Sequence, residues 1–296
     1  MHHDDSPPAP RPARRSKLTL TLAVPAAAAL AGWLVWGAVS GPAKSAPSQA
    51  RPAPGPSGSG PSVPGPSAST APLSLAGKTV VIDPGHNPGN FDHPREINRL
   101  VDIGTNRKEC DTTGTSTNSG YTEAEFTLDV SHRLRTLLRK QGATVTFTHD
   151  ADRPFGPCID ERARIGNAAK ADAVVSVHAD GSATGNRGFH VILPAQVKDG
   201  AADTTRIVAP SRTLGERVAR EFARATGSAP ANYVGGGTGL DVRKDLGGLN
   251  LSTVPKVFIE CGNMRDPKDA ALLTDAAWRQ KAAQGIAVGV STYLRG

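Results

Sequence analysis

Residues 80–86 read VVIDPGH, a short run of apolar, β-branched residues that ends at once in Asp-Pro-Gly and a histidine. An apolar run of this length, bounded by a turn, is typical of a buried strand. Because Pro84 and Gly85 bend the chain sharply after the strand, His86 can lie over the sheet edge instead of pointing into the core. The sequence therefore predicts a strand that delivers a histidine at its carboxyl end.

Similar apolar runs recur along the chain and alternate with helical patterns. The predicted strands cover residues 78–83, 143–148, 172–178, 188–193 and 256–260. The predicted helices cover residues 122–140, 159–170, 211–226 and 275–294. This alternation predicts an α/β fold in which a mixed, mostly parallel central sheet carries helices on both faces, within a single catalytic domain of residues 73–296.

Two more chemically active residues follow the same pattern as His86. His178 in AVVSVHAD and Glu260 in VFIECG each fall at the carboxyl end of a predicted strand. Open α/β sheets bind their ligands at that edge. One such histidine by itself is equally well explained as a hydrogen-bonded core or loop residue. Three such positions together indicate a functional site.

A fourth candidate, Glu123, lies at the start of the helix predicted over 122–140. Thr122 and Glu125 have the spacing of a capping box, which turns the Glu125 side chain back toward the cap. At about 100° per residue, Glu123 falls about 20° from Val130, within the apolar stripe of the helix. A buried carboxylate there is costly unless a metal relieves it. The alternative is an ordinary first-turn acid favoured by the helix dipole.

Imidazole and carboxylate groups together suit zinc. Three protein ligands that leave one coordination position open are the arrangement of a catalytic zinc site, and a fourth acidic group then serves as a proton shuttle. No HExxH segment places two ligands one helical turn apart, so the fold has to bring the four residues together. Placement at the sheet edge alone leaves open whether Glu123 or Glu260 is the third ligand.

The N-terminal quarter of the chain has a different composition. Residues 18–40 carry no charge, follow a basic stretch, and are long enough to cross a bilayer of about 30 Å. We expect a transmembrane signal-anchor or a signal peptide that follows a cytoplasmic segment of residues 1–17. Residues 41–72, rich in Pro, Gly and Ser, are predicted to be a linker. The domain is then expected in the cell envelope, outside the cytoplasm, either anchored to the membrane or secreted.

The net charge of +7 is not a nucleic-acid signal. Six basic and two acidic residues precede residue 72, so the domain itself carries only about +3. Few aromatic residues and no clustered stripe of Lys and Arg argue against a nucleic-acid groove. We therefore expect no nucleic-acid partner, contact with the membrane through the N-terminal segment, and a monomeric protein.

The chain has three cysteines. In an exported protein this number suggests one disulfide and one free thiol. Cys110 and Cys158 both lie in polar, turn-rich segments, whereas Cys261 directly follows an apolar run. We expect a Cys110–Cys158 disulfide and a small buried Cys261 with no nucleophilic role.

IDPGH, the helix-opening Glu123, SVHAD and PKVFIECG occur in this order across residues 79–262. In this they resemble the zinc-dependent N-acetylmuramoyl-L-alanine amidases of the amidase-3 type, particularly the actinobacterial single-domain form. The resemblance implies Zn²⁺ held by His86, Glu123 and His178, with Glu260 as catalytic acid/base. It also implies cleavage of the amide between N-acetylmuramic acid and the L-Ala of the stem peptide, with peptidoglycan and muropeptides as partners.

Two departures from the family pattern are visible. No wall-binding repeat is recognisable, and Thr127 stands where many relatives carry Asn four residues after the ligand Glu. Two other classes of function stay open at this point. One is a zinc peptidase that cleaves another cell-wall peptide bond, and the other is a non-catalytic wall-binding module, although such a module has no need of a proton shuttle.

Overall fold

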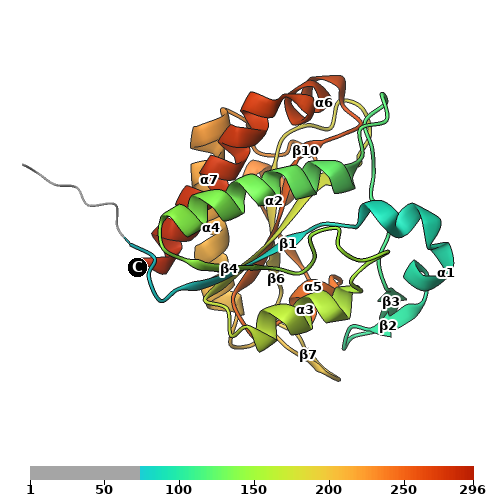
Figure 1. Cartoon of the computed structure of the whole chain (residues 1–296), viewed down its shortest axis with the longest axis vertical. Coiled ribbons are helices and arrows are strands. Elements are labelled where there is room, and N and C mark those ends of the chain that lie inside the picture. Colours follow the sequence, from blue (N-terminus) through green and yellow to red (C-terminus); the bar gives the residue numbers. More distant parts are fainter. Residues whose placement is uncertain (1–73) are drawn as a thin grey trace, which may run out of the picture. The chain divides into compact units, whose positions relative to one another are not determined.

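The computed structural model describes residues 74–296 (Figure 1). The predicted membrane segment 18–40 and linker 41–72 lie outside the described residues. Within the described part of the chain, no helix is long and apolar enough to cross a membrane.

A six-stranded sheet forms the centre of the domain, with the strand order β4-β1-β5-β10-β6-β9. The strands are β1 (Thr79–Pro84), β4 (Thr144–Phe147), β5 (Ala173–Asp180), β6 (His190–Pro194), β9 (Leu240–Arg243) and β10 (Lys256–Asn263). The first four strands in that spatial order run parallel, β6 pairs antiparallel with β10, and β9 pairs parallel with β6. The predicted mixed, mostly parallel sheet is confirmed.

Helices cover both faces of this sheet, as predicted (Figure 1). One face is covered by α2 (Glu123–Lys140), α4 (Val208–Thr226) and α7 (Ala276–Leu294), and the other by α3 (Ile159–Ala168) and the short α5 (Gly247–Asn250). A further helix, α6 (Pro267–Thr274), packs on β10 and α7.

The alternation of side chains along β5 shows how the two faces differ. Its sequence, AVVSVHAD, places every second residue on each face. Ala173, Val175 and Val177 join the main apolar core with α2, α4 and α7. Ser176 and His178 point to the other side. We call the first side the apolar face. The polar face is the opposite side of the sheet, which carries Asp83, Ser176, His178, Lys256, Phe258 and Glu260.

Tight packing of two long helices closes the apolar face. α7 meets α4 at Gly285 and Gly289, where an added Cβ would lie 2.7 Å from the Cα of Phe222 and 2.6 Å from the Cα of Val218. Only glycine permits so close an approach. Phe222 is completely buried at this seam, and burying a side chain of this kind stabilises the fold by about 1.5–3 kcal/mol.

The long polar segment between β1 and α2 is structured. It contains η1 (Pro88–Asp92), α1 (Pro94–Ile97), β2 (Leu100–Asp102) and β3 (Arg107–Glu109). Cys110 in this segment forms a disulfide with Cys158, and Cys261 is free and buried in the apolar core. The Cys110–Cys158 pairing and the burial of Cys261 are as predicted.

Some small elements have no counterpart among the sequence-based predictions. They are α1, α5, α6, the edge strand β9, the hairpin pairs β2–β3 and β7 (Lys198–Asp199)–β8 (Ala202–Asp203), and the 3₁₀ turns η1 and η2 (Gly235–Gly237). They are too short to show a hydrophobic period, so neighbouring structure defines them.

Candidate metal centre

His86 lies at the carboxyl edge of the sheet, separated from the end of β1 by Gly85. The turn is held by a hydrogen bond in which Gly85 N–H donates to the carbonyl of Val177, 2.9 Å away. His86 itself adopts φ +62°, a left-handed conformation that non-glycine residues rarely take. Its Nδ1 lies 3.0 Å from the carbonyl oxygen of Thr112. Donation of Nδ1–H to that carbonyl leaves Nε2 free to face the site.

His178 reaches the same place from β5, on the polar face. Its ring stacks on Phe258, with ring centroids 5.2 Å apart. On the other side it lies against Gly85, where an added Cβ would be 2.3 Å from Cε1 of His178. The sequence assigned Gly85 to a sharp turn, but the positive φ falls on His86 instead. Glycine is required at position 85 because a side chain there would displace the imidazole ring.

Glu123 is the first residue of α2, and the helix cap has the form predicted. Thr122 and Glu125 make both contacts of the capping box. Glu123 is buried and points the other way: its Oε2 lies 3.1 Å from His86 Nε2, and its Oε1 lies 2.9 Å from His178 Nδ1. Glu123 therefore lies on the buried side of α2, as predicted, whereas Glu125 is exposed.

The donor set and its spacing fit a zinc ion. Three of the described residues could hold a metal ion together, because their donor atoms lie within 4.8 Å of one another: His86, Glu123 and His178. Tetrahedral zinc, bound at about 2.0–2.1 Å, separates its ligand atoms by about 3.3 Å. Burial lowers the pKa of His86, but the carboxylates of Glu123 and Asp111 together outweigh burial and raise that pKa well above its usual value. A buried carboxylate that faces two imidazoles is a place where a cation is stabilised.

Glu260 lies beside this group on the neighbouring strand β10, paired in register with His178. Its Oε2 is buried and has no hydrogen-bond partner within the described part of the chain. Burial, followed by the negative charges of Glu123 and Asp180, raises the pKa of Glu260 well above its usual range. A carboxyl group with a raised pKa and a free oxygen is suited to exchanging protons.

His190 could not be placed from the sequence. The structure buries it on β6, directly opposite Glu260 in the antiparallel pair β6–β10. Its Nδ1 makes no hydrogen bond to any residue of 74–296. His190 therefore belongs to the polar face next to Glu260, away from solvent.

Two hollows flank the histidine pair and share His86, His178, Leu246 and Phe258 as walls. One, of about 180 Å³, extends toward β3 and α5, with Lys108 and Ile159 in its lining. The other, of about 210 Å³, contains Glu123, Asp180, Arg243 and Glu260. The two candidate histidine ligands therefore line both hollows.

Four charged residues beneath the site have no counterpart among the functional residues predicted from the sequence. Asp83, Asp111, Arg162 and Lys256 are all buried, and they lie on the strand end, the disulfide loop, α3 and the start of β10. A signal was present for Arg162, because it shares the buried face of α3 with Ala163 and Gly166. A charged residue on the buried side of a helix needs a partner, but the sequence does not say which one.

Comparisons with known proteins agree with this geometry. The family model for N-acetylmuramoyl-L-alanine amidases of the amidase-3 type matches residues 80–292. The N-acetylmuramoyl-L-alanine amidase Rv3717 of Mycobacterium tuberculosis is 42% identical over 228 residues, which cover 77% of this chain and 90% of that protein.

Two solved structures show the same fold. The amidase Ami1 of Mycobacterium smegmatis matches with a TM-score of 0.68 and 38% identity, over 75% of this chain and 99% of its own. The apo form of Ami1 from Mycobacterium abscessus matches with a TM-score of 0.67 and 39% identity, over 74% of this chain and 100% of its own.

Proposed function

The chain belongs to the amidase-3 family of N-acetylmuramoyl-L-alanine amidases, and we propose that it hydrolyses the amide between N-acetylmuramic acid and the L-Ala of the stem peptide. In this proposal His86, Glu123 and His178 hold a zinc ion. Glu260 is the acid/base. The observation that carries the proposal is the convergence of three donor groups beside a carboxyl oxygen that has no partner among residues 74–296. The four segments that carry these residues are far apart in the sequence and come together there.

The residues of the site divide the work of hydrolysis. Zinc, when bound, lowers the pKa of a water molecule and polarises the substrate carbonyl. Glu260 takes a proton from the attacking water and passes it to the leaving nitrogen of L-alanine. The products are a free stem peptide and a glycan that carries a lactyl carboxylate.

The ligand set favours this division over the competing one, in which Glu260 is the ligand and Glu123 the base. Glu123 has both carboxylate oxygens directed at imidazole nitrogens, and its Oε2 also accepts a hydrogen bond from the Thr115 N–H at 3.0 Å. A base needs a free oxygen and a raised pKa. Burial opposes a low pKa at Glu123, yet His86 and His178 hold it well below its usual range, whereas that of Glu260 is raised.

Digestion of purified peptidoglycan followed by mass analysis of the fragments tests the proposed reaction. We expect free stem peptides that begin with L-Ala, about one zinc per domain, loss of activity on chelation, and recovery when zinc is restored. Fragments cut at another peptide bond would instead support a zinc peptidase.

We also propose that the N-terminal segment determines where the protein is located. A membrane segment over residues 18–40, followed by the linker 41–72, would hold the amidase on the outer side of the membrane within reach of its polymer. Fractionation of the native host should recover the full-length chain with the membrane, or a form cut near Ser40 outside the cell. Recovery of the full-length chain in the cytosol would contradict this proposal.

A further inference from the structure

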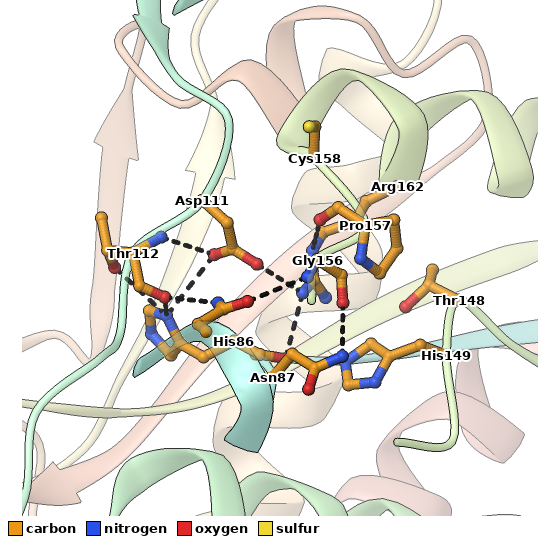
Figure 2. Close-up of polar contacts among 12 residues, drawn as sticks. His86, Asn87, Asp111, Thr112, Thr148, His149, Gly156, Pro157, Cys158 and Arg162 are labelled. Carbon is orange, nitrogen blue, oxygen red and sulfur yellow. Dashed lines mark hydrogen bonds and ion pairs between the residues drawn. The ribbon is translucent and has the colours of Figure 1, made fainter. Parts of the chain in front are cut away.

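A buried ionic network lies directly behind the ligand His86 (Figure 2). Asp111 and Arg162 occupy its centre and form an ion pair of 2.9 Å. Both side chains are about 6% exposed, and neither belongs to the group of His86, Glu123 and His178 whose donor atoms could hold a metal. They therefore require an explanation other than coordination.

Arg162 joins three segments of the chain. Its guanidinium donates to five oxygen atoms: Pro157 O (2.8 Å), Asp83 Oδ1 (2.8 Å), Pro84 O (2.6 Å), His86 O (3.0 Å) and Asp111 Oδ2 (2.9 Å). The guanidinium has five N–H groups in a fixed fork, so its donor capacity is used completely. Two of these oxygens are the main-chain carbonyls of Pro84 and His86, which lie on either side of the Gly85 turn.

This arrangement bears on the backbone of His86. A non-glycine residue at φ +62° is strained, and such a conformation persists only where its surroundings hold it in place. Arg162 holds the carbonyl of His86 itself and that of Pro84 two residues earlier. Arg162 thereby fixes the direction in which the imidazole leaves the main chain.

Asp111 acts on the other end of the same ligand. Its Oδ1 accepts the N–H of Thr112 at 2.8 Å, and the Thr112 carbonyl lies 3.0 Å from His86 Nδ1. Oδ1 of Asp111 is itself 3.6 Å from that nitrogen. Metal-binding histidines usually donate their second N–H to a carbonyl or carboxylate, which fixes the tautomer and the ring orientation. Asp111 and Thr112 supply such a partner and leave Nε2 to face Glu123.

The disulfide holds the two halves of this network together. Cys110 directly precedes Asp111, and Cys158 is the cap residue of α3 whose carbonyl accepts the N–H of Arg162 at 2.9 Å. In addition, Ile159 N–H donates to the Cys110 carbonyl at 2.7 Å. The bond thus joins the loop that carries Asp111 to the helix that carries Arg162.

We propose that Asp111 and Arg162 are positioning residues for His86, kept in register by the Cys110–Cys158 disulfide, and that the zinc affinity of the centre depends on them. This inference rests on the proposed zinc site. It concerns how strongly the metal is held and not which bond is cleaved.

Competition of the purified protein with a chromophoric zinc chelator measures the affinity directly. We expect Asp111→Asn and Arg162→Gln each to weaken zinc binding by about 10- to 100-fold, the usual effect of losing an outer contact to a ligand. Arg162→Lys should recover part of the loss, because lysine keeps the charge but lacks the fork. Replacing both Cys110 and Cys158 with serine should also weaken binding.

Two control variants separate positioning from general stability. Arg153 lies just before α3 and forms an ion pair with Glu161 of that helix. Arg153→Gln removes this ion pair and should leave zinc affinity unchanged. Val218→Ala destabilises the apolar face without touching the site and should also leave it unchanged. The d–d spectrum of the cobalt-substituted protein should change in Asp111→Asn and not in either control.

The outcomes are distinguishable. If the unaltered protein binds no zinc, the proposed function itself fails. If it binds zinc and the Asp111 and Arg162 variants bind it equally well, only the positioning role is overturned. The same conclusion follows if Val218→Ala weakens zinc binding as much as they do, because the effect would then reflect stability alone.

Discussion

The two faces of the central sheet differ in how much charge they bury. On the apolar face, Val175 and Val177 pack with Phe222 and other apolar side chains of α2, α4 and α7. On the polar face, the completely buried Asp83 accepts hydrogen bonds from Lys256 at 2.9 Å and from Arg162 at 2.8 Å. The apolar face is filled by apolar side chains, whereas the polar face combines these buried ion pairs with a small apolar cluster in which Val81 and Val174 pack against α3.

The difference shows what each face contributes. Apolar burial is favourable in proportion to area and tolerates small shifts in geometry. A buried ion pair must first offset a large desolvation cost, so its presence is weak evidence of a stabilising role. Burial opposes ionisation of Asp83, yet Lys256 and Arg162 hold the pKa of that carboxyl well below its usual range. We interpret the polar face as the part that positions the proposed metal centre, and the apolar face as the main source of stability.

The sharpest test of this contrast is a change on the polar face that should affect rate alone. Glu260→Gln keeps the shape of the side chain but cannot accept a proton at neutral pH. It should retain zinc and the fold while losing about 10²- to 10⁴-fold in rate, the usual scale of acid/base catalysis. Zinc stoichiometry and muropeptide release measure the two properties separately.

The matched variant for this experiment is Glu123→Gln, which should lose zinc. A zinc-depleted Glu260→Gln protein, together with a zinc-loaded Glu123→Gln protein, would reverse the roles of the two glutamates.

A second test compares one deletion on each face. Phe222→Ala leaves a cavity in the apolar core and should lower the free energy of unfolding by about 3–5 kcal/mol. Lys256→Met removes one cation from Asp83 and should cost a similar amount, because it leaves a buried charge undercompensated. Denaturant unfolding gives the stabilities, and chelator competition gives the zinc affinities.

Only Lys256→Met should weaken zinc binding, through Asp83 and Arg162. Equal loss of zinc affinity in Phe222→Ala would remove the distinction between the faces.

The free energy of unfolding should depend on pH because His149 is buried and neutral in the folded protein. His149 Nε2 lies 3.0 Å from the Pro84 carbonyl, while the N–H of Ala151 donates to its Nδ1 at 3.3 Å. A proton on Nδ1 would oppose that donor. Burial and then the positive charge of Arg162 lower the pKa of His149 to about 4.

An unfolded histidine titrates near pH 6.5, so below that value the unfolded state binds more protons. The contribution of His149 is fully present above about pH 6.5 and is lost as the pH falls toward 4, amounting to at most about 3 kcal/mol. In His149→Gln the free energy of unfolding, plotted against pH, should have a smaller slope between about pH 4 and 6.5. An unchanged slope would show that protonation of His149 does not cause this pH dependence.

The smallest effect is expected at the helix that carries Glu123. Glu125→Ala removes the carboxylate that accepts the Thr122 N–H at 3.0 Å and should cost about 1 kcal/mol of stability, with zinc content unchanged. Glu123→Ala should release the metal. Equal zinc loss in the two variants, as measured by metal analysis, would place the capping glutamate in the site as well.

Much of this molecule could be predicted from short-range sequence patterns. Apolar runs located the five strands β1, β4, β5, β6 and β10, and helical spacing located α2, α3, α4 and α7. The capping box at Thr122 separated Glu123 from Glu125, and composition paired Cys110 with Cys158. These features depend on residues that are close in the chain or on residue type alone, so a single sequence contains them.

Tertiary structure alone decided the rest. Gly85 has to be glycine because the ring of His178, from another strand, occupies the space of its Cβ. Asp83 meets Arg162 across 79 residues of sequence and Lys256 across 173, and His190 faces Glu260 through strand register. The sequence by itself identified the residues that we propose to carry the chemistry, because residue type and local periodicity can be read along the chain. Only the folded sheet decided how those residues are supported, because burial and charge pairing depend on neighbours that no local pattern specifies.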